Sequence, residues 1–73
     1  MAYTENKQEI CDLLLKALQA TRNLSDLDDL MYLRPHEDFE IVIATFSNGH
    51  QKKINVSLDS GTAMIRDIMR HID

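Results

Sequence analysis

The sequence predicts an α+β fold of two layers, in the order α-β-β-β-α, in which a three-stranded antiparallel meander carries both helices on one face. Three observations lead to this prediction. Two alternating apolar segments flank Asn48-Gly49, which is the strongest short-range signal for a β-hairpin. One apolar stripe at helical spacing precedes these segments and another follows them. Each end of the chain is therefore expected to be helical.

The first helix is expected over about residues 5–21. Its apolar side chains recur at helical spacing, with charged and amide side chains on the opposite side. Asn23 is a candidate for a left-handed residue that stops the helix. The next segment is ambiguous, because Ser25–Asp29 can form one helical turn while Leu30–Arg34 fits a strand. A strand over about 29–34 is preferred, since Arg34–Asp38 contains the proline and makes a hairpin loop.

The central hairpin is expected to join strands over about residues 39–47 and 50–58. A two-residue type I′ turn at Asn48-Gly49 pairs Ser47 with His50, because both turn residues tolerate positive φ. Counting outward, Ile43 lies opposite Ile54 and Ile41 opposite Val56, on the side that meets the helices.

This register predicts a surface of apolar residues on the side of the sheet that the helices leave open. Two amphipathic helices cover one face only, and a contiguous apolar patch on the other often marks an interaction site. The predicted surface consists of Leu30, Tyr32, Val42, Ala44 and Phe46. Should the first hairpin loop be one residue shorter, Leu30 and Tyr32 turn inward and only the last three remain exposed.

The second helix is expected over about residues 60–72, capped by Asp59 or Ser60, with Leu58 as a hydrophobic staple. Its buried stripe is expected to contain Ala63, Met64, Ile65, Ile68, Met69 and Ile72.

Composition restricts the class of protein. A chain of 73 residues makes a single domain, 1–73, of a size at which one core gives marginal stability. A net charge of −4 argues against a general affinity for nucleic acid or anionic membranes. The absence of a membrane-spanning stretch or a signal pattern, together with one cysteine, leads us to expect a cytoplasmic protein.

No pattern in the sequence indicates an enzyme, a cofactor, a metal or a small-molecule substrate. His36, His50 and His71 are not at ligand spacing, and no second cysteine completes a zinc set. The acids near Asp28 lack the glycine and distal glutamate of a calcium loop. Cys11 lies within a helical apolar stripe, where a thiol behaves as a small hydrophobe.

Two resemblances accompany these patterns. The first rests on the α-β-β-β-α order, on the Pro35-His36 loop, and on the apolar stretch that begins at 39–43 and leads to the turn at Asn48-Gly49. With these features, about two-thirds of the chain resembles the double-stranded-RNA-binding domain. That family binds the phosphates of the RNA with a lysine cluster at the start of its second helix. At this position the present chain has Ser60-Gly61-Thr62, which carries no positive charge. In the nucleic-acid-binding alternative, the contacts would come from Arg34, His36, Lys52, Lys53, Arg66 and Arg70. The segments 54–57 and 59–65 are similar to the C-terminal part of short uncharacterised bacterial proteins, some from prophages.

The sequence therefore predicts a small non-enzymatic protein-interaction module. Its expected partner is a second copy of itself, bound through the open face of the sheet, or else another protein. A nucleic-acid-binding accessory protein is the alternative.

Overall fold

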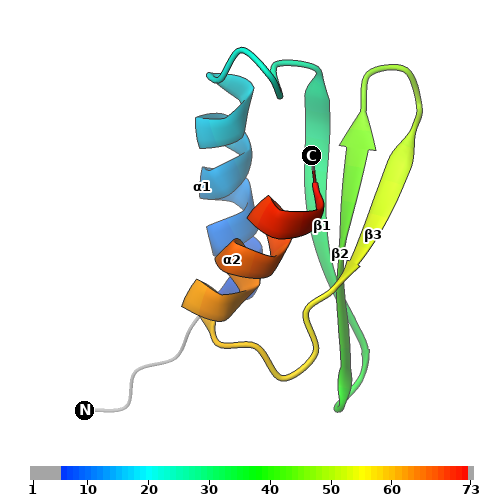
Figure 1. Cartoon of the computed structure of the whole chain (residues 1–73). Coiled ribbons are helices and arrows are strands. Elements are labelled where there is room, and N and C mark those ends of the chain that lie inside the picture. The colour runs from blue at the N-terminus through cyan, green and yellow to red at the C-terminus, as the bar shows by residue number, and fades with distance from the viewer. Residues whose placement is uncertain (1–5, 73) are drawn as a thin grey trace.

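The computed structural model describes residues 6–72 and confirms the α-β-β-β-α order. The elements are α1 (Lys7–Gln19), β1 (Leu27–His36), β2 (Phe39–Phe46), β3 (Gln51–Asn55) and α2 (Gly61–His71). The strands form one antiparallel sheet in the order β1-β2-β3. Both helices lie on the same side of this sheet, α1 alongside β1 and α2 across it (Figure 1). The opposite face of the sheet is not covered by any described residue.

Helix α1 is shorter than expected at its C-terminal end. The Asn6 side chain caps its start by accepting a hydrogen bond from the Glu9 amide at 3.0 Å; the expected start at residue 5 lies outside the described residues. At the other end, the Thr21 hydroxyl donates to the Leu18 carbonyl at 2.6 Å, which satisfies a helix-end acceptor. Asn23 does not have positive φ, so its predicted role as a left-handed stop is wrong.

Strand β1 is longer than expected and contains two irregularities. It begins at Leu27, so Ser25–Asp29 does not form a helical turn. The register with β2 shifts at Asp28 and again at Arg34-Pro35. At the second shift, the two residues Arg34 and Pro35 lie opposite the single residue Glu40. Proline has no amide to donate to a ladder, and a bulge on an edge strand accommodates it. Because His36 pairs with Phe39, the turn contains only residues 37 and 38 rather than the expected loop.

The turn between β2 and β3 has three residues, not two. The Gly49 amide donates to the Phe46 carbonyl at 2.9 Å, and the Phe46 amide donates to the His50 carbonyl at 2.8 Å. Gly49 has a φ of 88°. These features describe a type I turn followed by a left-handed glycine that forms a bulge. The predicted type I′ turn, with Ser47 paired to His50, is therefore wrong.

This turn moves β2 by one residue relative to β3. Val42 lies opposite Ile54 and Ala44 opposite Lys52, where the type I′ register placed Ile43 opposite Ile54. A one-residue shift sends every side chain of a strand to the other face. Ile54 and Val56 remain in the core as expected, so the inversion falls on β2.

The side chains of β1 are inverted together with those of β2. Leu30 pairs with Ala44 and Tyr32 with Val42, so the prediction that these side chains share one face of the sheet is confirmed. The group faces the helices, however, and not the open side. The buried core consists of Cys11, Leu18, Leu24, Leu27, Leu30, Val42, Ala44, Ile54, Val56, Met64, Ile68 and Ile72.

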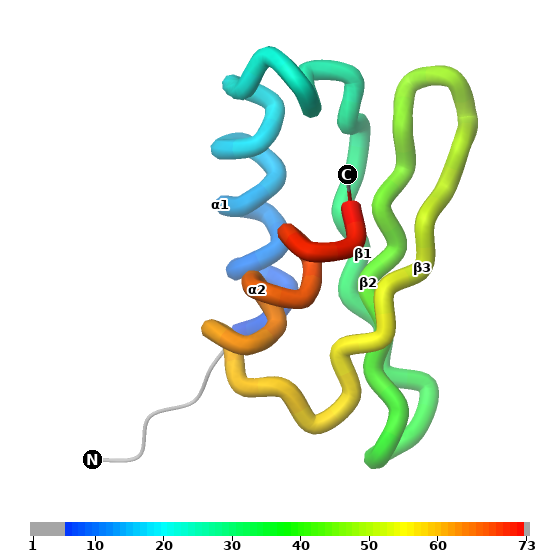
Figure 2. Tube along the Cα trace, viewed as in Figure 1, coloured from blue at the N-terminus to red at the C-terminus, as the bar shows by residue number. Residues whose placement is uncertain are grey.

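Helix α2 is capped by Ser60, whose hydroxyl accepts from the Ala63 amide at 3.2 Å. Its buried stripe contains Met64 and Ile68 and continues to the buried C-cap residue Ile72, while Ile65 and Met69 are exposed, which corrects the wider expected stripe. Figure 2 shows the connection from β3 to α2 crossing from the sheet to the helix layer, beside the lower part of the β1–β2 hairpin.

Leu58, in this connection, has an unfavourable backbone conformation. Its φ is 63°, and its side chain is 81% exposed, so it is not the expected hydrophobic staple. A left-handed conformation costs a residue with a Cβ about 1–2 kcal/mol, and glycine avoids most of this cost. The connection therefore stores strain that no packing of the Leu58 side chain offsets.

We expect Leu58→Gly to raise the free energy of unfolding by about 0.5–1 kcal/mol, after allowance for the greater flexibility of glycine in the unfolded chain. Urea denaturation followed by circular dichroism measures this change. Leu58→Ala is the control, because it removes the exposed side chain but keeps the Cβ, and its stability should not increase. A less stable glycine variant would show that Leu58 makes a contact that offsets its conformation.

Candidate interaction surface

The open face of the sheet carries five apolar side chains from β1 and β2. Met31, Leu33 and Phe39 are 45%, 37% and 40% exposed, and Ile41 and Ile43 are half-buried. The register places Met31 opposite Ile43 and Leu33 opposite Ile41, so these side chains are neighbours on one face. We call these five residues the open-face patch.

Strand β3 borders the open-face patch with polar side chains. Gln51, Lys53 and Asn55 alternate with the inward-facing residues of β3 and are exposed. The side-chain amide of Gln51 donates to the Thr45 hydroxyl on the same face at 3.2 Å. An apolar centre with a polar border is the composition typical of a protein-protein contact surface.

The surface predicted from the sequence is not exposed. Leu30, Val42 and Ala44 are fully buried, and Tyr32 and Phe46 are half-buried and packed against the core. The assignment of these five residues to the open face is wrong, because it depended on the two-residue turn at Asn48-Gly49. Two members of the open-face patch, Ile41 and Ile43, are side chains that the prediction placed on the side that meets the helices.

The hydrophobic pattern could not decide which side of β1 and β2 faces the helices. Both alternating sets along β1 and β2 are apolar, so each could form a core face. The polar residues of β3 do identify its outer side, but they fix the side of β2 only once the length of the turn is known. The sequence Phe46-Ser47-Asn48-Gly49-His50 also fits a three-residue loop with glycine in the left-handed position, and this was the available signal.

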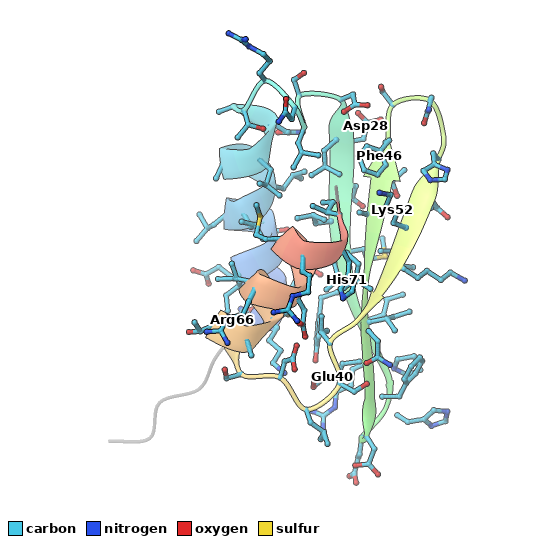
Figure 3. All side chains as sticks on the ribbon, viewed as in Figure 1. Asp28, Glu40, Phe46, Lys52, Arg66 and His71 are labelled. Carbon is cyan, nitrogen blue, oxygen red and sulfur yellow. The ribbon has the colours of Figure 1, made fainter. Side chains whose placement is uncertain are left out.

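A buried carboxylate lies at the lower end of the sheet (Figure 3). Glu40 points toward the helices and is 6% exposed. The Lys7 ammonium lies 2.8 Å and 3.1 Å from its two carboxylate oxygens, and Arg34 Nε lies 4.0 Å away. The same ammonium lies 5.9 Å from the centre of the Tyr32 ring. This cluster joins the start of α1 to the start of β2.

The neighbours of Glu40 determine its ionisation. The hydrogen bond from Lys7 is the largest effect and holds the pKa of Glu40 below its ordinary value, while burial acts in the opposite direction. Burial and a hydrogen bond to Glu40 raise the pKa of Tyr32. Glu40 is therefore a paired carboxylate at neutral pH, suited to holding the fold together rather than to accepting a proton.

A second acidic group lies near the start of α2. The hydrogen bond with Asp67, followed by burial, raises the pKa of Asp59. One carboxylate oxygen of Asp59 is buried and has no hydrogen-bond partner among residues 6–72. Two carboxyl groups that share a site favour holding one proton between them.

Cys11 is fully buried in the core. Burial raises the pKa of its thiol to about 11, with smaller contributions from Asp12 and Asp29. The thiolate is the nucleophilic form of cysteine, and it is scarcely populated at neutral pH under these conditions. Cys11 therefore acts as a core side chain.

The bases considered for nucleic acid come from three different elements of the fold, β1, β3 and α2. Arg34 and His36 lie near the β1–β2 turn, and the Arg34 guanidinium donates to the Glu37 carbonyl at 3.2 Å. Lys52 and Lys53 lie on β3, with Lys52 donating to the Ile72 carbonyl at 3.0 Å. Arg66 lies on the side of α2 away from the sheet, and His71 at the end of α2 near β3 (Figure 3); Arg70 is exposed on α2.

Within residues 6–72, no group of three or more histidine, cysteine or acidic side chains is arranged to hold a metal ion. Neither α1 nor α2 is long and apolar enough to span a membrane. Comparison with protein families, curated proteins and solved structures gives no significant match to this chain.

Proposed function

We propose that this chain is a small non-enzymatic protein-interaction module that pairs with a second copy of itself through the open-face patch. The observation that carries the proposal is the exposure of Met31, Leu33 and Phe39 beside Ile41 and Ile43, on a sheet face that no described residue covers. A sheet with two apolar faces is stable in water when both are covered. The helices cover one face, and a partner would cover the other.

A second copy suits this surface because the patch can complement itself. Two-fold symmetry brings the same surface of both copies together. With the axis parallel to the strands and between β1 and β2, Met31 and Leu33 of each copy lie over Ile43 and Ile41 of the other. The polar residues of β3 then form the border on both sides. Apolar area meets apolar area, and Lys53 stays in contact with water.

The size of the patch sets the expected affinity. Five partly exposed apolar side chains amount to roughly a few hundred Å² per copy. Stable interfaces bury about 800 Å² per partner, and smaller ones belong to weak or transient complexes. We therefore expect a concentration-dependent dimer with a dissociation constant in the micromolar range.

Sedimentation velocity over a concentration series tests this proposal. The wild-type chain should change from a mass of 8.4 kDa to twice that mass as concentration rises. Ile43→Asp should weaken the association at least about tenfold, because it places an unpaired charge at the centre of the contact.

Leu13→Asp is the matched control, since Leu13 is 60% exposed on α1 and outside the open-face patch. This variant should dimerise as the wild type does. A wild-type chain that stays at 8.4 kDa throughout the series, or a Leu13→Asp variant as weakened as Ile43→Asp, would contradict the proposal.

A further inference from the structure

The two edges of the sheet differ in how their backbone groups are satisfied. Along β1, glutamine side chains of α1 occupy the outward groups. Gln8 accepts from the Tyr32 amide at 3.0 Å and donates to the Leu30 carbonyl at 3.5 Å, and Gln19 donates to the Leu27 carbonyl at 2.8 Å. An edge that is covered in this way cannot pair with another strand.

Strand β3 has no such cover. Phe46 pairs with His50, and the Val56 amide donates to the Glu40 carbonyl at 3.0 Å. Because hydrogen-bonded pairs alternate in an antiparallel ladder, Lys52 and Ile54 direct their backbone groups toward β2. Gln51, Lys53 and Asn55 then direct theirs outward, and no side chain of residues 6–72 hydrogen-bonds to those groups.

A hollow of about 470 Å³ runs along this edge, between β3 and the end of α2. Its lining consists of Lys52, Lys53, Ile54, Asn55 and His71. Figure 3 shows Lys52 and His71 on the side of β3 that faces α2, whereas Lys53 lies on the open face. Among the residues that the structure describes, the lining thus contains basic side chains on both sides of β3 and no carboxylate.

A second copy does not fit this edge well. When two β3 strands pair antiparallel with full overlap, Lys53 lies directly opposite its own copy, and like charges in that position are destabilising. An extended segment with acidic side chains has the opposite property. Its backbone can pair with the outward groups of β3, and its carboxylates lie beside Lys53 on one side or beside Lys52 and His71 on the other.

We infer that the β3 edge is a binding site for an extended acidic peptide segment of another protein, which adds to the sheet as a fourth strand. This site is distinct from the open-face patch, and it does not require dimerisation.

Amide hydrogen exchange measured by NMR on the full chain tests the inference. The Ile43→Asp variant is used, so that pairing through the open-face patch does not contribute. The probes are three blocked octapeptides that alternate valine with glutamate, with glutamine or with lysine, at up to about 1 mM, which detects weak binding. The glutamate peptide should slow exchange at Gln51, Lys53 and Asn55 and bind at least about tenfold more tightly than the lysine peptide.

Lys53→Glu in the same background should reduce or reverse this preference without changing the spectrum of the core. Absence of protection by all three peptides would overturn the inference, as would equal binding of the glutamate and lysine peptides. Protection at these amides that rises with protein concentration alone would identify a second copy as the occupant instead. Protection by a duplex RNA but not by the glutamate peptide would identify nucleic acid. Neither outcome bears on the open-face dimer, which the mass measurement tests separately.

Discussion

Val42→Asp should unfold the protein at 25 °C, whereas Ile43→Asp should leave the native fold in place. Val42 is fully buried between the sheet and the helices, while its neighbour Ile43 points to the open face. An unpaired carboxylate at a buried position costs more than about 4 kcal/mol. A domain of this length has roughly 4–11 kcal/mol of stability in total, so this one change removes most or all of it.

The same contrast should be measurable with milder changes. Val42→Ala removes buried methyl groups and should cost about 2 kcal/mol, and Ile43→Ala about 1 kcal/mol or less. Circular dichroism and urea denaturation, at concentrations below those at which the proposed dimer would form, measure both pairs of variants. The two-residue turn would require the opposite order, with the Ile43 variants the more damaged. This comparison therefore tests the register of the sheet as well as the stability of the core.

The second large effect concerns the ion pair between Lys7 and Glu40. Lys7→Met should lower the free energy of unfolding by about 2–3 kcal/mol at pH 7, because it leaves a buried carboxylate without its main partner. The value lies below that for a fully buried pair because the Lys7 side chain is 17% exposed. Lys16→Met is the control, since Lys16 is exposed on the same helix, and it should change stability by less than about 0.5 kcal/mol.

The effect of Lys7→Met should depend on pH in a defined direction. Lys7 holds the pKa of Glu40 below the ordinary value of 4.5, so this pair stabilises the folded state above that pH. The contribution is lost as the pH falls through the lowered pKa of the folded state, because protonated Glu40 no longer needs the ammonium. The difference in stability between wild type and variant should therefore be largest near neutral pH and shrink below the ordinary pKa. A difference that stays constant on acidification would show that Lys7 acts through packing of its aliphatic chain.

The elements themselves were predictable because their signals are local. The apolar stripes of residues 5–21 and 60–72 have helical spacing, and the segments around Asn48-Gly49 alternate. The boundaries were less predictable, because a side-chain hydrogen bond such as that of Thr21 satisfies the end of a helix, whereas a bulge such as that at Pro35 lets a strand continue past a proline. The sequence also separated the side chains of β1 and β2 into the correct two groups, since alternation depends only on the extended backbone.

The site was not predictable to the same degree. Deciding which group faces the helices requires the pairing of β2 with β3, and this depends on one residue of turn length. Both groups are apolar, so burial alone could not correct the choice. Glu40 adds to the difficulty, because a carboxylate at an inward position looks wrong until Lys7, thirty-three positions earlier in the chain, is placed beside it.

By itself, the sequence determined the order of helices and strands and the alternation of side chains within each strand. These follow from spacing along the chain and from the conformational preferences of a few residues. Only the tertiary structure decided which apolar set became core and which became the open-face patch. The physical reason is that a strand has two equivalent sides until a neighbour is paired with it. The left-handed backbone of Gly49 and the bulge that it forms shift the pairing of β2 with β3 by one residue from the register of a two-residue turn.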